Sequence, residues 1–139
     1  MKRRNFLIAL GVLPPLVFSS CGKAEFPASP TVITGKVVDE NDKPVEGVKF
    51  RFSGFYLKGI SPIPTFDVDG ETNKDGIYSV SYVVTNGEAE FLPQNSPKYD
   101  FNSQFNIFVW KNNQYVKVNG VGPLIYGEKN TFNFQIRKR

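Results

Sequence analysis

Histidine is absent from the 139 residues of this chain, and cysteine, methionine and tryptophan each occur once. A single cysteine allows no disulfide within the chain, so the stability of the folded part depends on a hydrophobic core. Without imidazole, a transition-metal site would have to be built from carboxylates and tyrosines, and a serine or threonine nucleophile would lack its usual base. We therefore expect no catalytic residues, no metal ligands and no cofactor.

Most of the chain also lacks an excess of charge of one sign. The sequence holds 17 lysines and arginines against 13 acidic residues, and three of the basic residues are Lys2, Arg3 and Arg4. Removing these three from the 17 leaves 14 basic against 13 acidic residues, which is almost a balance. Nucleic acid is therefore not an expected partner.

The N-terminal segment has the order of a secretion signal, with basic residues, an apolar run at positions 6–18, and small residues before Cys21. The apolar run has thirteen residues and contains Pro14 and Pro15. A membrane-spanning helix needs about 20 apolar residues. We therefore interpret residues 1–20 as a signal peptide rather than a transmembrane helix.

The end of this signal, Phe18-Ser19-Ser20-Cys21, resembles the lipobox of bacterial lipoproteins. The resemblance implies a lipoprotein signal peptide at 1–20, a diacylglycerol on the Cys21 sulfur, and cleavage before that residue. It implies a protein of the cell envelope whose partner is the membrane, held through lipidated Cys21 on the periplasmic side or in the outer membrane. A signal peptide without lipidation is the alternative.

The route of export stays open. Arg3-Arg4-Asn5-Phe6-Leu7 is similar to the twin-arginine motif, which directs folded proteins across a membrane. A basic start alone would also explain the two arginines, so Sec and Tat export are both compatible with the sequence.

The rest of the chain divides into a tether and one domain. Residues 21–30 contain Pro27 and Pro30 and few apolar side chains, which is typical of a short linker. Residues 31–139 number 109, a suitable length for one domain with its own core.

Hydrophobic residues in this domain recur with the period of β-strands. Phe50 and Phe52 alternate with Lys49 and Arg51, and the segment 77–84 alternates in the same way. Further strand-like runs lie at 32–39, 104–111, 114–118 and 131–137. Since no stretch of ten or more residues has the pattern of an amphipathic helix, we predict an all-β fold, a single antiparallel β-sandwich of about seven strands.

Two turns carry a family resemblance. The segment "GKVVDENDKPVEGVKF" at 35–50 and the segment "TNKDGIYSV" at 72–80 resemble the signatures of carboxypeptidase regulatory-like domains. In the second, Gly76 can take the positive φ that a tight turn requires. The resemblance implies an Ig-like, prealbumin-like (transthyretin-like) sandwich at 31–139. A sandwich of this kind hosts unrelated functions, so the function must come from a site.

Two enzyme groups share this scaffold, and both use histidine. The chain resembles exported relatives of intradiol dioxygenases in its signal and opening strands, and those enzymes hold a ferric ion with two tyrosines and two histidines. The transthyretin-related hydroxyisourate hydrolases also rely on histidine. Because this chain has none, we expect no enzyme activity, and a degenerate dioxygenase-like protein is kept as an alternative.

Two acidic segments, 39–42 and 67–76, have oxygen-bearing side chains of the kind that bind calcium. In the second segment Gly70 stands where an EF-hand loop has a ligand, and no bidentate glutamate follows at the twelfth position. Acidic and amide residues are also those that β-turns select. We therefore interpret both segments as turns.

Aromatic residues are abundant, with 13 Phe, 6 Tyr and 1 Trp. Those at strand period are predicted to form the core: Phe50, Phe52, Tyr78, Tyr82, Phe105, Phe132 and Phe134. Trp110 follows Ile107 and Val109, which alternate as inward-facing residues, and the pattern does not decide which face of the strand carries Trp110.

The remaining aromatics lie in two segments that we interpret as Pro/Gly-rich insertions, 54–66 and 91–101, the second of which contains Phe91. Apolar residues in loops either pack over the end of a sandwich or form a binding surface. The residues proposed for that surface are Phe55, Tyr56, Phe66, Tyr99 and Phe101.

These observations favour a lipid-anchored cell-envelope β-sandwich that acts as a non-catalytic binding or structural module. Its partner would be an envelope protein or a glycan. The alternatives are a carbohydrate- or small-ligand-binding domain and a degenerate intradiol-dioxygenase-like protein.

Overall fold

The computed structural model describes residues 26–118 and 120–139, and within these ranges its regular secondary structure is entirely β-strand. The strands of this part of the chain are β1 (Thr31–Val38), β2 (Lys49–Lys58), β3 (Ser61–Glu71), β4 (Ile77–Tyr82), β5 (Glu88–Gln94), β6 (Phe105–Lys111), β7 (Gln114–Lys117), β8 (Lys129–Thr131) and β9 (Phe134–Lys138). The signal peptide, most of the tether and Cys21 lie outside the described residues.

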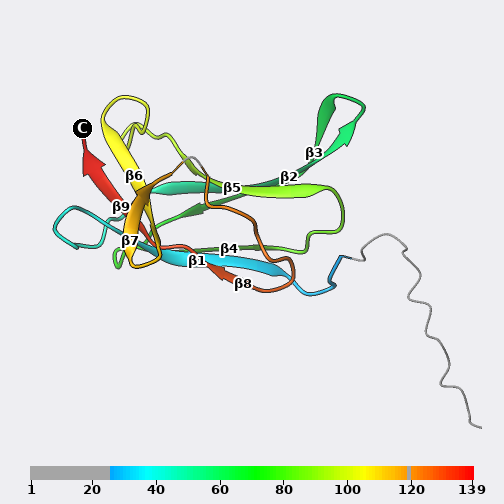
Figure 1. Ribbon diagram of the computed structural model, residues 1–139, viewed down its shortest axis with the longest axis horizontal. Helices are drawn as coiled ribbons and strands as arrows, with labels where there is room; N and C mark the ends of the chain where they lie inside the picture. Colours follow the sequence, from blue (N-terminus) through cyan, green and yellow to red (C-terminus); the bar gives the residue numbers. More distant parts are fainter. Residues whose placement is uncertain (1–25, 119) are drawn as a thin grey trace, which may run out of the picture.

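The strands form two sheets that pack face to face. The larger sheet has the order β4-β1-β9-β6-β7, with β8 also paired to β1, and the smaller sheet has the order β3-β2-β5. Figure 1 shows β2 and β5 lying over β1, β4 and β8. The prediction of an all-β sandwich is therefore confirmed.

Two details of the prediction are wrong. The described residues contain nine strands instead of about seven, and the larger sheet is mixed, because β1 pairs antiparallel with β4 but parallel with β8 and β9. Ile33 lies opposite Asn130, and Val37 lies opposite Phe134. The run expected at 131–137 is broken at 132–133, so its two parts pair with different halves of β1.

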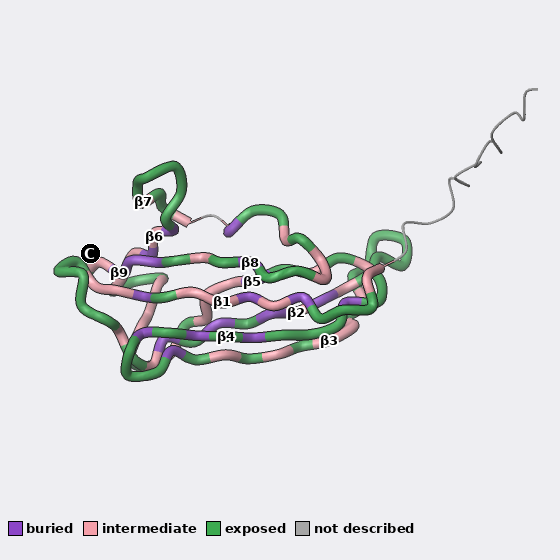
Figure 2. The backbone as a smooth tube through the Cα atoms, turned by 90° about the horizontal axis from the view of Figure 1, so that it is seen from below, coloured by how far each residue is buried: buried purple, intermediate pink, exposed green. Residues whose placement is uncertain are grey.

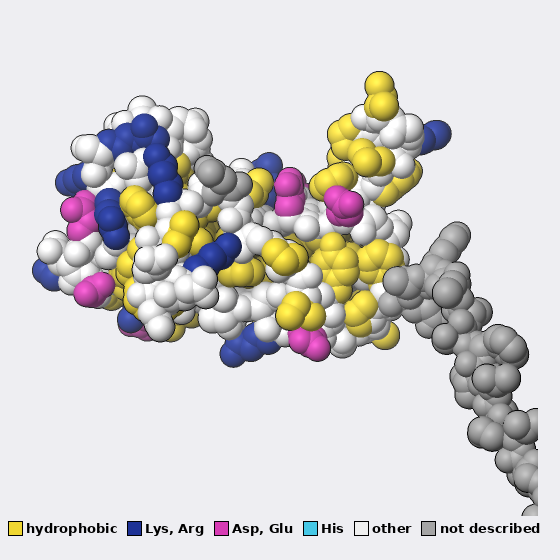
Figure 3. Space-filling view, in the orientation of Figure 1, with side chains coloured by type: hydrophobic (Ala, Val, Ile, Leu, Met, Phe, Trp, Pro, Cys, Tyr) yellow, Lys and Arg dark blue, Asp and Glu magenta, His cyan; other side chains and the backbone are white. Residues whose placement is uncertain are grey.

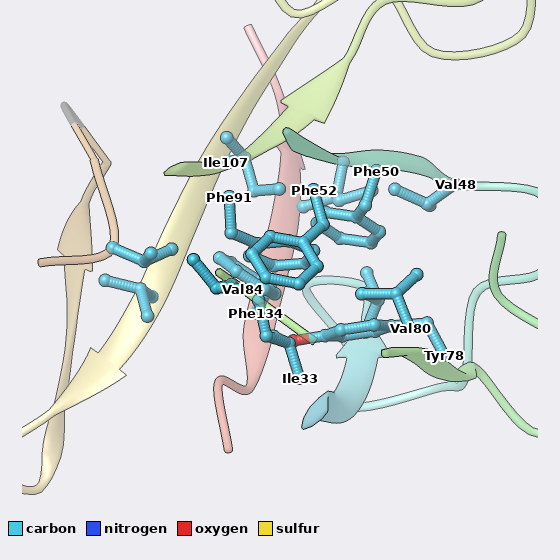
Figure 4. Close-up of a cluster of buried hydrophobic side chains, with 14 residues drawn as sticks. Ile33, Val48, Phe50, Phe52, Tyr78, Val80, Val84, Phe91, Ile107 and Phe134 are labelled. Atoms are coloured by element: carbon cyan, nitrogen blue, oxygen red, sulfur yellow. The ribbon is translucent and has the colours of Figure 1, made fainter. Parts of the chain in front are cut away.

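The core lies between the sheets and is built around Phe50. The ring of Phe50 is fully buried and packs against the rings of Tyr78, Phe91 and Phe134, with centroid distances of 4.5, 5.1 and 5.1 Å. Figure 4 shows these rings with aliphatic side chains from both sheets around them. Figure 2 shows buried residues alternating with exposed ones along the strands. The alternation predicted for β2 is confirmed, since Phe50 and Phe52 are buried and Lys49 is exposed.

Four of the seven predicted core aromatics are buried, namely Phe50, Phe52, Tyr78 and Phe134. Phe105 and Phe132 are half-buried and pack against the edge of the core. Tyr82 was expected inside but is 39% exposed, because it is the last residue of β4, and its ring stacks on Phe66 near the end of the sandwich. Phe91 was assigned to an insertion but is buried in the core, because the segment containing it forms strand β5 against β2.

The turn before β4 has the predicted backbone. The Asn73 side-chain oxygen accepts hydrogen bonds from the N–H groups of Asp75 and Ile77 at 2.9 and 3.0 Å. Gly76 has φ +72°, and a Cβ at this position would lie against the carbonyl oxygen of Val37. The close approach of the turn to β1 and the positive φ explain why glycine occupies this position.

Candidate binding surface

The segment 54–66, expected to be an irregular insertion, is a regular β-hairpin. The end of β2 pairs with the start of β3, with Phe55 opposite Pro64 and Lys58 opposite Ser61, and Gly59 and Ile60 form the turn. We call residues 55–64 the hairpin arm. The sequence hid the strand, because Pro62 and Pro64 are typical of loops and are tolerated only at the outer edge of a sheet.

A β-bulge lies at the base of the hairpin arm. The β2–β3 register shifts between Gly54 and Phe55, so Thr65 is the extra residue on β3. A Cβ at position 54 would collide with the ring of Phe66, so the close approach requires glycine. A bulge bends the strand that carries it and increases its twist. Figure 1 shows the arm turning away from the sandwich at the end of β2.

The hairpin arm exposes apolar side chains to solvent. Ile60 is 99% exposed, Leu57 61% and Tyr56 40%. Strand β5 pairs with β2 only as far as Phe55, which lies opposite Glu88, so the arm beyond that point has two strands. Figure 3 shows hydrophobic side chains over most of this projection.

Phe66 lies at the base of the arm and contributes to packing. Its ring stacks on Tyr82 at 4.1 Å and meets the ring of Phe52 edge-on at 4.9 Å. It thereby closes the end of the sandwich between β3 and β4. Of the five residues proposed for a binding surface, Phe55 and Tyr56 lie in the arm and Phe66 lies directly below it.

Tyr99 and Phe101 lie at the opposite end of β2. The Tyr99 hydroxyl donates a hydrogen bond to the carbonyl oxygen of Glu46, shortly before β2, at 3.2 Å. The Phe101 carbonyl oxygen accepts a hydrogen bond from Arg139 at 3.1 Å. The structure therefore divides the proposed residues into two groups, because the long β2 separates the two ends of the sandwich.

Each of the two loop aromatics lines a hollow. Tyr99 and Phe105 are the aromatic residues that line an open groove of about 800 Å³, and Lys98 lies 5.4 Å from the centre of the Tyr99 ring. The charged side chains along this groove are Asp39, Glu40, Glu46, Lys98 and Lys138. Phe101 lines a smaller hollow of about 290 Å³. The sequence missed the groove because its residues come from distant segments.

The acidic segment 39–42 is a turn, as interpreted from the sequence, but the interpretation of 67–76 is wrong for residues 67–71, which belong to strand β3. The Asp39 carboxylate accepts hydrogen bonds from the N–H groups of Asn41 and Lys43 at 2.8 and 3.0 Å. Asp67 and Asp69 are exposed on β3 and pair with Arg51 at 3.2 and 3.3 Å. Within residues 26–118 and 120–139, no three acidic or cysteine side chains are grouped to hold a metal ion.

The residues present do not fit the ferric site of the intradiol dioxygenases. The chain has no histidine for two of the four ligands. The hydroxyl of Tyr78 is buried and donates to the Phe132 carbonyl oxygen at 2.6 Å, and burial raises the pKa of this phenol far above its usual range. The Tyr126 hydroxyl is also engaged, since it accepts a hydrogen bond from Ala89 N–H at 2.9 Å.

Trp110 faces outward. Its neighbours Ile107 and Val109 are buried, whereas Trp110 is 45% exposed and meets the ring of Tyr115 edge-on at 4.8 Å. Burial and the charge of Asp42 raise the pKa of Tyr115. The Trp110 ring therefore lies on the outer surface of β6 and β7, which settles a point that the sequence left ambiguous.

No protein-family model matches the chain, and no curated protein matches it either. Two solved structures are similar to it in part. The 3-chlorocatechol 1,2-dioxygenase of Rhodococcus opacus 1CP has a TM-score of 0.46 and 12% identity, over 82% of this chain and 62% of the dioxygenase. The major plantain pollen allergen Pla l 1 has a TM-score of 0.40 and 14% identity, over 80% of this chain and 95% of the allergen. At these scores neither similarity carries a functional conclusion.

The described chain begins near the base of the hairpin arm. The Phe26 ring stacks on Tyr126 at 5.7 Å, and the Tyr126 hydroxyl bonds to Ala89, which lies opposite Gly54 on β2. Figures 1 and 2 both place the start of the described chain and the arm at the same end of the sandwich. Within residues 26–118 and 120–139 there is no helix long and apolar enough to cross a membrane.

Proposed function

We propose that this chain is a lipid-anchored cell-envelope protein whose β-sandwich, of the carboxypeptidase regulatory-like type, acts as a non-catalytic binding module. The observation that carries the binding role is the hairpin arm. Its Leu57 and Ile60 are 61% and 99% exposed, and they add nothing to the core of the sandwich. Exposed apolar side chains that gather on one projection are typical of an interaction surface.

The anchor is supported by the sequence before the domain. The residues Phe18-Ser19-Ser20-Cys21 follow a basic start and a short apolar run, as in lipoprotein signals. A diacylglyceryl group provides two acyl chains, which is enough for stable membrane attachment.

The test of the anchor is a comparison of the protein with its Cys21→Ser variant in a bacterial host with lipoprotein processing. We expect the mature protein to begin at Cys21, to carry the mass of a diacylglyceryl group, and to partition into the detergent phase. The variant should be released or stay as precursor. Unchanged mass and partitioning in the variant would show that the chain is not a lipoprotein.

A second candidate function is carbohydrate binding in the groove beside Tyr99. The groove combines two aromatic rings with carboxylates and lysines, and such a mixture suits a sugar. Calorimetric titration of the purified protein with envelope glycans tests this candidate, with Tyr99→Ala as the variant. Binding that survives Tyr99→Ala would place the glycan elsewhere.

The non-catalytic part of the proposal is supported by the lack of histidine and by the buried, hydrogen-bonded Tyr78. We expect protein purified from its envelope to contain no stoichiometric iron and to leave catechols unopened. Iron at one equivalent together with ring opening would favour the dioxygenase-like alternative.

A further inference from the structure

The hairpin arm is a costly structure for a protein surrounded only by water. A two-stranded hairpin without further packing is at best marginally stable. Beyond Phe55 the arm has no third strand, and its side chains Tyr56, Leu57 and Ile60 remain exposed. An environment that covers these side chains would stabilise the arm, since burial of each aliphatic group is favourable.

The charges of the arm suit the surface of a lipid bilayer. Residues 54–66 contain no acidic residue, and Lys58 is their single charged residue. Acidic side chains begin only at the base, with Glu88 opposite Phe55 and Asp67 on β3. Tyrosine and lysine flanking aliphatic residues are typical of segments at a membrane interface, where their polar ends reach water.

The outer edge of the arm is poorly suited to pairing with another protein strand. Proline has no N–H to donate, and Pro62 and Pro64 alternate along β3. The outward edge therefore lacks two donors that an added strand would need, which is a known protection against edge-to-edge association. This disfavours strand addition by a second copy at the β3 edge, and the exposed aliphatic side chains with the single Lys58 suit lipid as the occupant of the arm.

A lipid on Cys21 would hold the start of the described chain near a membrane. Cys21 precedes Phe26 by five residues, which span at most about 17 Å when fully extended. Phe26 is connected through Tyr126 and Ala89 to the base of the arm. The arm itself extends about 13 Å from Gly54 to Lys58, a length similar to the reach of the tether.

We propose that the tip of the hairpin arm inserts into the interface of the lipid bilayer that holds the protein. The tip residues Leu57 and Ile60 enter the boundary between headgroups and acyl chains, and Tyr56 and Lys58 stay at headgroup level. This inference rests on the proposed lipid anchor for its geometry. It goes beyond that anchor, because it assigns a second membrane contact that fixes the orientation of the sandwich.

The experiment places an environment-sensitive fluorophore on the arm of the full-length processed protein. Ile60→Cys is labelled with a nitrobenzoxadiazole thiol reagent, and the protein is reconstituted in vesicles of phosphatidylethanolamine and phosphatidylglycerol. Ile77→Cys is the matched control, because Ile77 is also an exposed isoleucine, at 46%, and lies opposite Lys36 at the far end of β1. Mass spectrometry of the same sample reports whether Cys21 carries lipid.

The expected result is a blue-shifted emission at position 60 that spin-labelled lipids quench, with neither effect at position 77. Adding Leu57→Ser should lower the ratio of inserted to exposed arm about 10-fold, since loss of one buried aliphatic side chain has roughly that effect on the equilibrium. Because Ile60 is almost fully exposed, its replacement should leave the fold intact.

The other outcomes separate this inference from the anchor. A lipidated protein with a water-exposed label at position 60 overturns the insertion and leaves the anchor standing. A blue shift without vesicles that grows with protein concentration also overturns it, in favour of a second copy of the chain. If Cys21 is unmodified, the labelling is repeated in the Cys21→Ser background: a vesicle-dependent shift then supports insertion without the anchor, and no shift overturns both.

Discussion

Substitution of Phe50 by alanine tests the packing on which the sandwich depends. The side chain is fully buried and packs against three aromatic rings whose centroids lie within 5.1 Å of its own. Replacing a buried phenylalanine by alanine costs about 3–5 kcal/mol of folding free energy. We expect the upper part of this range, because stacked rings from both sheets cannot collapse into the cavity and each aromatic pair adds about 0.5–1.5 kcal/mol.

The assay is urea unfolding of the purified protein, followed by circular dichroism. With a slope of about 2 kcal/mol per M, a loss of about 4 kcal/mol moves the midpoint down by about 2 M. Lys49→Ala is the matched control, since Lys49 is the preceding residue on β2 and is exposed. Its substitution should change the stability by less than about 0.5 kcal/mol.

The loss in Phe50→Ala is large compared with the total stability of about 5–15 kcal/mol that is usual for a domain. If that variant does not fold, Phe50→Leu keeps most of the apolar volume and should cost roughly half as much. Equal and small losses from Phe50→Ala and Lys49→Ala would refute the register of β2 and the core built on it.

Three further predictions concern stability. Gly35→Ala should cost about 3 kcal/mol in urea unfolding, because the new Cβ collides with the Phe132 carbonyl oxygen. Burial raises the folded-state pKa of the Tyr78 phenol. The contribution of this group to folding stability is therefore fully present below pH 10.0 and is lost as the pH rises beyond that value. The decrease in unfolding free energy above pH 10.0 should be smaller in Tyr78→Phe than in the unsubstituted protein. An unchanged dependence of the unfolding free energy on pH would contradict this. A hydrogen bond from the Ser103 hydroxyl lowers the pKa of Asp100, so Asp100→Asn should destabilise the protein at neutral pH. The difference in stability between the variant and the unsubstituted protein should shrink in melts below pH 3.8.

Local patterns in the sequence predicted the parts of the fold that depend on neighbouring residues. The alternation at Phe50 and Phe52 indicated which face of β2 is buried, because side chains in a strand point to opposite faces in turn. The turn at Gly76 was predictable for a similar reason, since the tight turn requires a positive φ that glycine adopts readily.

Pairing between distant segments was not visible in these patterns. β5 was missed because Pro93 and the flanking polar residues resemble a loop, and only its partner β2 makes it a strand with Phe91 in the core. The parallel pairing of β1 with β8 and β9 has no local signal at all, because it depends on two segments about 100 residues apart.

For the candidate binding surface, too, the sequence indicated which residues are unusual, and the tertiary structure decided where they lie. Composition identified Phe55, Tyr56, Phe66, Tyr99 and Phe101 as unusual, and the sequence before the domain supplied Cys21, which lies outside the described residues. Only the tertiary structure decided that Phe66 packs on Tyr82, that Tyr99 lines a groove at the far end, and that residues 55–64 project as an arm. The physical reason is that residue type determines which side chains gain from burial, whereas strand pairing and the bulge at Gly54 determine which of them obtain it.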